Sequence, residues 1–273
     1  MPRYAKECAA SKPWADAIMT KVRLDQHHGI RRDASGLTLR VGVLCALLLA
    51  GTHAPYVWSS KPTITSTVAD KLALAAEARY ANFAKEKPSD DARHIADWVA
   101  DSRDNARVEF FIIDKKAARI YVFDADAQLK GSSAVLLGFA KGDDSAPGIG
   151  LKPLKAVKPE EKTTPAGRFV AERGRNMSGE DVIWIDYDAA VSMHRVRTNN
   201  AKERRLERLA TATVDDNRIS FGCVNVPVAF YNTHIRPVFA KRRAIVYVLP
   251  ETKTVQQMFK SYDVAARHSL PAK

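Results

Sequence analysis

The residues best suited to covalent chemistry surround Cys223, in the run Ser220-Phe221-Gly222-Cys223-Val224-Asn225. A thiol becomes a strong nucleophile when its surroundings lower its pKa and favour the thiolate. The sequence predicts a helix over residues 226–239, and the positive end of its dipole would have this effect on a cysteine just before it. The alternative is a buried structural cysteine, and the spacing alone does not decide between the two.

The residues beside Cys223 are suited to positioning a substrate. Gly222 allows a sharp turn and the close approach of a substrate, and the N–H groups around the cysteine are candidates for an oxyanion hole. Ser220 either orients a catalytic group or ends a strand. Asn225 either positions the substrate or caps the following helix.

The elements around this run are mostly short strands. We expect them at 108–113, 118–123, 133–137, 167–170, 182–185, 190–193 and 244–249. A loop rich in Gly, Pro and Lys spans 141–164, and loops of this length often carry function. Many short strands with one late helix predict a mainly β domain over residues 107–250, followed by a C-terminal tail over 251–273.

The N-terminal part of the chain has a different composition. Residues 1–40 hold eight Lys/Arg against four Asp/Glu, and residues 41–58 are uncharged and mostly apolar. The core of this stretch matches a signal peptide, and the whole is just long enough for a short membrane span. Because arginines precede it, we expect a basic cytoplasmic leader, then a signal anchor or signal peptide, and an exported remainder anchored at the inner membrane.

Residues 59–106 are expected to form a linker and a helical pre-domain. One helix is predicted from about 67 to 83, and Lys87-Pro88-Ser89 ends it. A second helix is predicted to begin near Ser89, with Ile95, Trp98 and Val99 on its apolar face. The sequence leaves open whether these helices pack on the later domain or hold it away from the membrane.

The composition limits the class of function. The chain has 273 residues, 46% of them hydrophobic, and a net charge of +12, which describes a folded protein with an anionic partner. Zinc-finger spacing, a Gly-rich strand–helix loop and RNA-binding motifs are absent from the sequence, so we expect no metal, no cofactor and no nucleic acid. In an exported domain the single cysteine, Cys223, is either buried or retained for its reactivity.

The region from Phe110 onward resembles the catalytic domain of the L,D-transpeptidases of the YkuD type. Ser220 to Asn225 resembles the family signature Ser/Thr-His-Gly-Cys-hydrophobic-Asn/Arg. Three further pieces resemble family elements in the family's order: the opening strand pair at Phe110 to Phe123, the glycine that ends the third strand at Gly138, and the Thr-Pro-x-Gly-x-Phe element at Thr164-Pro165-Ala166-Gly167-Arg168-Phe169. Met193-His194 resembles the strand-borne catalytic histidine.

The resemblance implies a β-sandwich in which Cys223 cleaves a peptidoglycan stem peptide, forms a thioester and passes the acyl group to an amine on a neighbouring stem. It makes His194 the base that takes the thiol proton, and it places Ser220, Phe221, Gly222 and Asn225 around the substrate. It also implies a role in cell wall biogenesis and cell shape, in the periplasm.

Two features depart from the family pattern. Phe221 stands where the family normally has a histidine, and 28 residues separate His194 from Cys223, which is longer than the usual gap. The extra stretch is predicted to form a basic helix followed by a loop, with Lys202, Arg204, Arg205 and Arg208. We expect its individual charges to be solvated and the whole segment to be a lid that meets stem-peptide carboxylates. These departures favour a divergent branch with a non-standard donor position, such as that of a first-to-third cross-link.

Three other functions remain open at this stage. Water in place of the acceptor amine would make the chain an L,D-carboxypeptidase. Loss of catalysis at Phe221 would leave a peptidoglycan-binding module. A basic nucleic-acid-binding protein would need a cytoplasmic location, and the apolar stretch over 41–58 argues against that.

Overall fold

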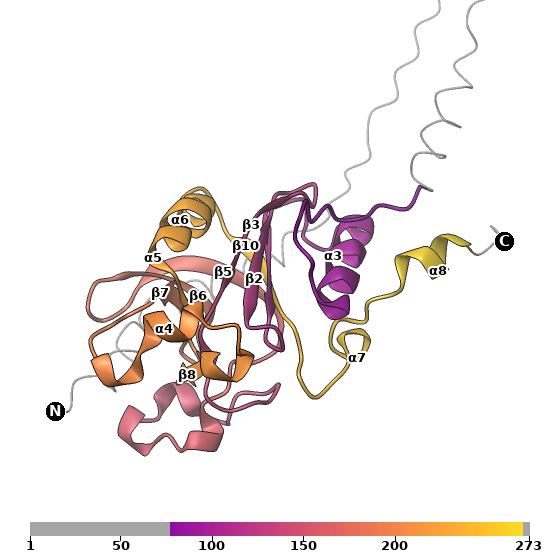
Figure 1. The fold of residues 1–273 in the computed structure, drawn as a ribbon. Coiled ribbons are helices and arrows are strands. Elements are labelled where there is room, and N and C mark those ends of the chain that lie inside the picture. The colour runs from indigo at the N-terminus through magenta and orange to yellow at the C-terminus, as the bar shows by residue number, and fades with distance from the viewer. Residues whose placement is uncertain (1–76, 270–273) are drawn as a thin grey trace, which may run out of the picture. The chain divides into compact units, whose positions relative to one another are not determined.

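A computed structural model describes residues 77–269, the coloured ribbon of Figure 1. The leader, the apolar stretch over 41–58 and most of the first predicted helix lie outside the described residues. Within 77–269, no helix is long and apolar enough to cross a membrane. The first predicted helix does not extend to 83, because Asn82 forms a bridge with Gln128 and its neighbours are turn or coil.

The described chain is mainly β, as predicted. Its strands are β1 (Phe110–Asp114), β2 (Arg119–Phe123), β3 (Leu129–Ala134), β4 (Leu137–Gly138), β5 (Gly167–Arg175), β6 (Asp181–Asp186), β7 (Val191–Arg195), β8 (Arg218–Ser220), β9 (Val224–Val226) and β10 (Ala244–Val248). Eight of them form one sheet in the order β3-β2-β1-β10-β5-β6-β7-β9, and β4 pairs with β8 in a separate parallel ribbon.

The large sheet bends back on itself, where the resemblance had implied a sandwich. Leu136, two residues after β3, exchanges two backbone hydrogen bonds of 2.9 Å with Asn225 of β9. The segment that follows the edge strand β3 is therefore hydrogen-bonded to β9, the strand at the opposite edge of the sheet. A single continuous sheet whose edges meet therefore takes the place of two stacked sheets.

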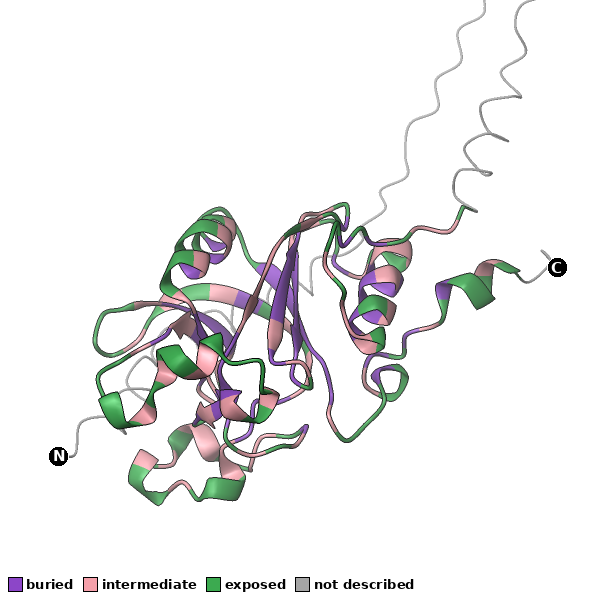
Figure 2. Cartoon of the chain, in the orientation of Figure 1, coloured by how far each residue is buried: buried purple, intermediate pink, exposed green. Residues whose placement is uncertain are grey.

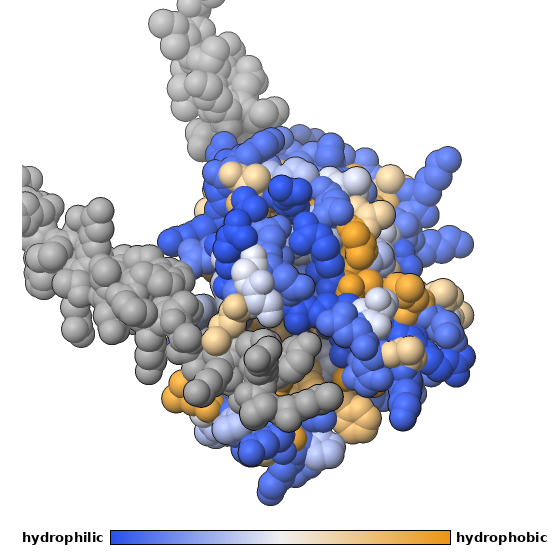
Figure 3. Space-filling model, turned by 90° about the vertical axis from the view of Figure 1, so that its left-hand side faces the viewer, coloured by the Kyte–Doolittle hydropathy of each residue, from blue (hydrophilic) through white to orange (hydrophobic). Residues whose placement is uncertain are grey.

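Residues of the central strands alternate between two hydrophobic clusters. Phe111 and Ile113 of β1 face a cluster enclosed by the bent sheet, together with Ile120, Val122, Ile183, Met193, Val224 and Val246. Phe110 and Ile112 face the opposite side. Because successive side chains of a strand point to opposite faces, a strand buried on both sides reads as a continuous apolar run. Figure 2 shows the buried strands, while the face seen in Figure 3 is mostly hydrophilic.

The second cluster, which contains Phe110 and Ile112 and which we call the outer cluster, is covered by helices from both ends of the described chain. Helix α3 (Asp90–Ser102) starts as predicted at Ser89, whose side chain accepts a hydrogen bond from the Ala92 N–H. It contributes Ile95, Trp98 and Val99 to the cluster, and α7 (Val255–Phe259) contributes its two end residues. Helix α8 (Val264–Ser269) follows. Hydrophobic packing thus continues across both expected domain boundaries, at 107 and at 250.

The remaining helices lie in the connections. Short 3₁₀ turns occupy the long loop at η1 (Ile149–Leu151), η2 (Leu154–Ala156) and η3 (Pro159–Glu161), and the stretch before β8 holds η4 (Ala201–Glu203), α4 (Arg205–Ala210) and η5 (Val214–Asn217). Helix α4 is the basic helix predicted between His194 and Cys223.

Two predicted elements are displaced. The strand expected at 133–137 is centred earlier, as β3, and the helix expected from 226 begins at Val228. That helix consists of α5 (Val228–Phe230), the π-helical turn η6 (Tyr231–Ile235) and α6 (Arg236–Phe239). Pro237 has no N–H to continue the regular ladder, which accounts for the irregular turn before it.

Candidate active site

Cys223 lies in the short turn between β8 and β9, next to strand β7. The parallel pairing of β7 with β9 aligns Met193 with Val224 and His194 with Asn225. This register places Ser192 beside Cys223, with the Ser192 N–H 3.5 Å from the sulfur and the Ser192 hydroxyl 3.7 Å from it. Residues far apart in the sequence therefore meet at the thiol.

The surroundings of Cys223 favour the thiolate. Burial acts to raise the pKa of the thiol, but a hydrogen bond and charge interaction with His194 and the donors of Ser192 outweigh it and lower the pKa from 9.0 to about 7. A large fraction of the sulfur is then ionised at neutral pH, which is the state that attacks a carbonyl carbon. Cys223 as a residue is half-buried.

The ring of His194 is held in one orientation. Its Nδ1 lies 2.8 Å from the carbonyl oxygen of Arg195. A carbonyl only accepts hydrogen bonds, so Nδ1 must carry the proton, and Nε2 of the neutral ring is left as an acceptor. Nε2 can therefore take the proton of the Cys223 thiol, and the imidazolium that results supplies the charge that lowers the pKa of the thiol.

The helix dipole is not the cause of the lowered pKa, contrary to the expectation from sequence. Strand β9 stands between Cys223 and the helix, which begins at Val228 with Pro227 as its N-cap residue. The effect of a helix terminus falls off within about one turn. The pKa of the thiol is instead lowered by His194 and by Ser192, a residue that sequence reasoning treated only as part of a strand.

The turn that carries Cys223 is fixed by hydrogen bonds on both sides. Ser220 Oγ donates to the Cys223 carbonyl at 2.6 Å and accepts from the Gly222 N–H at 3.1 Å. Thr164 Oγ1 donates to the Gly222 carbonyl at 2.8 Å and accepts from the Gly138 N–H at 2.8 Å. Ser220 and Thr164, which both belong to motifs that resemble those of the family, therefore fix the shape of the turn.

Gly222 is required by this geometry. Its φ is +126°, and a Cβ there would lie 2.7 Å from the Thr163 carbonyl oxygen. Its N–H is already bonded to Ser220, so it is not free to stabilise an oxyanion. Across residues 77–269 the Cys223 N–H has no hydrogen-bond partner, which leaves it as the available donor in the turn.

Asn225 connects the cysteine turn to the basic segment before β8. It does not cap the helix, because it lies within β9 with its backbone paired to Leu136. Its Nδ2 donates to the Cys223 carbonyl at 3.1 Å, and its Oδ1 accepts from Arg205 Nη1 at 2.6 Å. The side chain of Arg205 is only 14% exposed and pairs with Glu203 at 2.5 Å.

The other charges of this segment are used in different ways. Arg208 donates to the carbonyl oxygens of Glu203 and Asp216, each at 2.8 Å, and so holds the segment together. Arg204 pairs with Glu207 at the surface, and Lys202 is exposed. Solvated charges were therefore the right expectation for Arg204 and Lys202 but not for Arg205 and Arg208.

Phe221, together with Lys162, forms a rim next to the cysteine turn. Its ring is 41% exposed, and Lys162 Nζ lies 4.0 Å from the ring centroid. Phe139 is also exposed, and its N–H donates to the Ser220 carbonyl at 2.9 Å. The position that carries a histidine in the family thus presents an apolar face with a cation over it.

A buried charge cluster, formed by Lys115, Asp143, Arg218 and Glu251, lies behind the turn. Lys115 is fully buried, and its Nζ lies 3.2 Å from Asp143 Oδ1 and 3.5 Å from Glu251 Oε2. Arg218 pairs with Glu251 and donates to the Lys115 carbonyl at 2.9 Å. The members come from four segments far apart in the sequence, and sequence reasoning found none of them.

The cluster supports the cysteine turn through Thr164. Lys115 Nζ donates to the Thr164 carbonyl at 3.0 Å, and the Thr164 hydroxyl holds Gly222. Burial lowers the pKa of Lys115, although Glu251 and Asp143 oppose this effect. Burial would raise the pKa of Asp143, but hydrogen bonds from the Thr252 hydroxyl and three backbone N–H groups hold it far below its usual range. Asp143 therefore stays ionised against Lys115.

The three other histidines within residues 77–269 make contacts elsewhere. His94 bonds to Ser261, His268 to Asp101, and His234 stacks on Phe230. Among the residues that the structure describes, no three His, Cys, Asp or Glu side chains are grouped so as to hold a metal ion.

Comparisons with known proteins find matches among solved structures, whereas no family model and no curated protein matches the chain. One neighbour is the catalytic domain of the E. faecium L,D-transpeptidase, with 16% identity and a TM-score of 0.29, over 52% of this chain and 98% of that one. Another is the helical cell shape determining protein Pgp2 from Campylobacter jejuni, with 14% identity and a TM-score of 0.36, over 60% of this chain and 52% of that one. The chain thus matches about half the length of Pgp2.

Proposed function

We propose that the chain is a cysteine acyltransferase of the L,D-transpeptidase type that acts on peptidoglycan stem peptides. The observation that carries the proposal is the thiol of Cys223, whose pKa is lowered to about 7 beside a histidine held with Nε2 free. The substrate class comes from the ordered set of family-like motifs in the sequence. Export and attachment to the inner membrane through residues 41–58 belong to the same proposal.

The first half-reaction forms the acyl-enzyme. His194 Nε2 takes the thiol proton, and the sulfur attacks the carbonyl carbon of the donor amide. The Cys223 N–H donates to the oxygen that becomes negative in the tetrahedral intermediate. The imidazolium then gives its proton to the leaving nitrogen, the C–N bond breaks, and a thioester remains on Cys223.

The second half-reaction releases the product. An acceptor amine attacks the thioester carbonyl, His194 takes the proton of that amine, and the C–S bond breaks to return the thiolate. Water in place of the amine would give hydrolysis by the same steps. The rim of Phe221 with Lys162 is where we expect the donor to be selected, because it borders the turn and combines an apolar face with a cation.

The proposal is tested by incubating the full chain with a purified stem tetrapeptide and measuring the intact mass. We expect an adduct of the acyl donor on Cys223 that disappears when an acceptor amine is added, together with a new amide product. Cys223→Ser should give neither species, because an alcohol has no accessible anion near neutral pH. A wild-type chain that never acquires the adduct, although Cys223 is rapidly alkylated, would contradict the transpeptidase assignment.

A further inference from the structure

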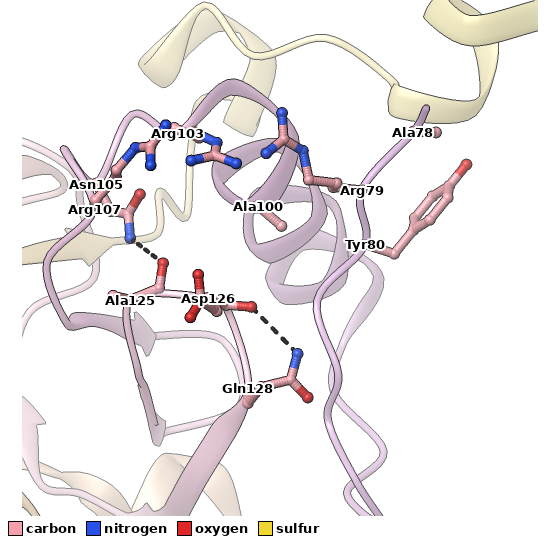
Figure 4. A pocket seen from close by; sticks show the side chains of 10 residues that line it. All are labelled: Ala78, Arg79, Tyr80, Ala100, Arg103, Asn105, Arg107, Ala125, Asp126 and Gln128. Carbon is pink, nitrogen blue, oxygen red and sulfur yellow. Dashed lines mark hydrogen bonds between the residues drawn. The ribbon is translucent and has the colours of Figure 1, made fainter. Parts of the chain in front are cut away.

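A pocket of about 360 Å³ lies where the start of the described chain meets the end of α3 and the turn between β2 and β3 (Figure 4). Three arginines line it, Arg79, Arg103 and Arg107, with the polar side chains of Asp126 and Gln128. Its size is within the range of small-molecule sites in proteins. We call it the arginine pocket.

The three guanidinium groups have no carboxylate partner. None of them forms an ion pair with any residue of the described part of the chain, and the buried Nε of Arg79 has no hydrogen-bond partner there. The neighbouring carboxylates are committed to other groups: Asp101 accepts from Tyr262 and His268, and Asp104 pairs with Arg168. Within residues 77–269 this positive charge therefore has no ion-pair partner, and Arg103 and Arg107 meet the solvent.

Desolvation, followed by repulsion from Arg79 and Arg107, lowers the pKa of Arg103. The C-terminal end of α3 offers about half a negative charge, and Asp126 offers one more. Together they do not balance three cations. A bound anion would remove this imbalance.

The backbone holds the arginines in place. Arg103, Ala106 and Arg107 have φ values of 59°, 52° and 59°, a left-handed conformation that residues other than glycine seldom adopt. Buried Asn105 fixes this turn by donating to the carbonyl oxygens of Val108 at 2.8 Å and Ala125 at 3.2 Å. At Arg103 this conformation is the C-cap of α3, whose N–H donates to the Val99 carbonyl, and it turns the chain toward Arg107.

We propose that the arginine pocket binds a phosphate-bearing anion, independently of the chemistry at Cys223. Guanidinium groups donate paired hydrogen bonds to phosphate oxygens, and the carboxylate of Asp126 suits a hydroxyl group attached to the phosphate. The Gln128 amide instead bonds to Asn82 and to the Asp126 carbonyl. The phosphate belongs either to a soluble ester or to a lipid headgroup. The proposed membrane segment over 41–58 precedes Arg79 in the chain and would bring a lipid headgroup within reach of the pocket.

The test compares two charge-matched double variants of the full chain. Arg103→Gln with Arg107→Gln removes two cations of the pocket, whereas Arg236→Gln with Lys241→Gln removes two exposed cations at and after α6. Calorimetric titration with inorganic pyrophosphate should show binding to the wild type and to the second variant, and at least about tenfold weaker binding to the first. The alkylation rate of Cys223 should be the same in all three proteins, which checks that each variant is folded.

Vesicles distinguish the two sources of phosphate. Phosphatidylcholine vesicles with and without phosphatidylglycerol are mixed with each protein, and the increase in binding caused by phosphatidylglycerol is measured. An increase that the pocket variant loses and pyrophosphate competes away assigns a headgroup, and pyrophosphate binding without that increase assigns a soluble ester. The proposal is overturned if the wild type binds neither probe, or if the pocket variant and its control bind both probes equally.

Discussion

The cysteine turn is held from two sides, and the two supports differ in physical character. The buried charge cluster reaches Gly222 through Thr164, and its side chains are almost completely excluded from solvent. The basic segment before β8 reaches the Cys223 carbonyl through Arg205 and Asn225, and its outer ion pair, Arg204 with Glu207, is mostly exposed. Water cannot reach the charges of the buried cluster unless the core opens. Water can reach the outer charges of the basic segment in the folded protein. We therefore expect the cluster to determine both stability and activity, and the basic segment mainly activity.

The largest effect is expected from Lys115→Met. The change leaves Asp143 and Glu251 buried with Arg218 as their remaining cation, and breaking a buried ion pair costs about 3–5 kcal/mol. Denaturant unfolding of the variant measures the loss. Lys116→Met is the matched control, because the neighbouring Lys116 pairs with Asp91 at the surface and should cost less than about 1 kcal/mol. If Lys115→Met and Lys116→Met lost the same free energy of unfolding, the buried charge cluster would not differ from surface charges in its effect on stability.

A smaller effect on stability is expected from Thr164→Val. This change leaves the Gly222 carbonyl and the Gly138 N–H buried without their partner, at a cost of about 1–3 kcal/mol. Displacement of the turn should also slow acylation of Cys223 by roughly 10- to 100-fold. Thr163→Val is the control, since its hydroxyl takes no part in this pair of hydrogen bonds. Normal acylation in a destabilised Thr164→Val protein would show that the cluster supports the fold alone.

The smallest change in stability is expected from Arg205→Ala, at about 1 kcal/mol, because it leaves one buried acceptor, Asn225 Oδ1, without its partner, whereas Thr164→Val leaves two buried groups. Its loss frees Asn225 Oδ1, so we expect acylation to slow several-fold. The alkylation midpoint of Cys223 should stay unchanged, because His194 and Ser192 are not altered. Arg204→Ala, which removes an exposed neighbour, should change neither property. If Arg205→Ala changed neither the free energy of unfolding nor the rate of acylation, the basic segment would have no role at the turn.

The sequence predicts the parts of this molecule that depend on local patterns. The continuous apolar run of Phe110 to Ile113 and the cap at Ser89 set β1 and α3 without reference to the rest of the chain. Strands β8 and β9 were missed because three residues are too few to show an alternation. Val224 to Val226 extend as a strand because β7 and Leu136 offer them backbone partners on either side.

Prediction of the site follows the same division. Cys223 and His194 could be selected from family-like motifs, and the structure brings them together. Ser192 and the buried charge cluster give no such indication, because their roles depend on strand register and on contacts across more than 100 residues, as between Lys115 and Arg218. Thr164 lies in a family-like motif, but its hydrogen bond to Gly222 depends on the fold in the same way. The expected cause of the thiol's low pKa was wrong for a related reason: helix boundaries are predicted from sequence only to within about 2–4 residues, and this helix begins two residues later than expected, after β9.

The central claim is that His194 makes Cys223 ionise near neutral pH, and the rate of alkylation of the thiol as a function of pH tests it most directly. A lowered pKa means that the thiolate is present above that value and is lost as the pH falls through it. For the wild type we predict a midpoint at about pH 7, and for His194→Ala a midpoint shifted upward toward the ordinary thiol value of 9.0. A wild-type midpoint already near 9.0, or one near 7 that His194→Ala leaves in place, would contradict the account.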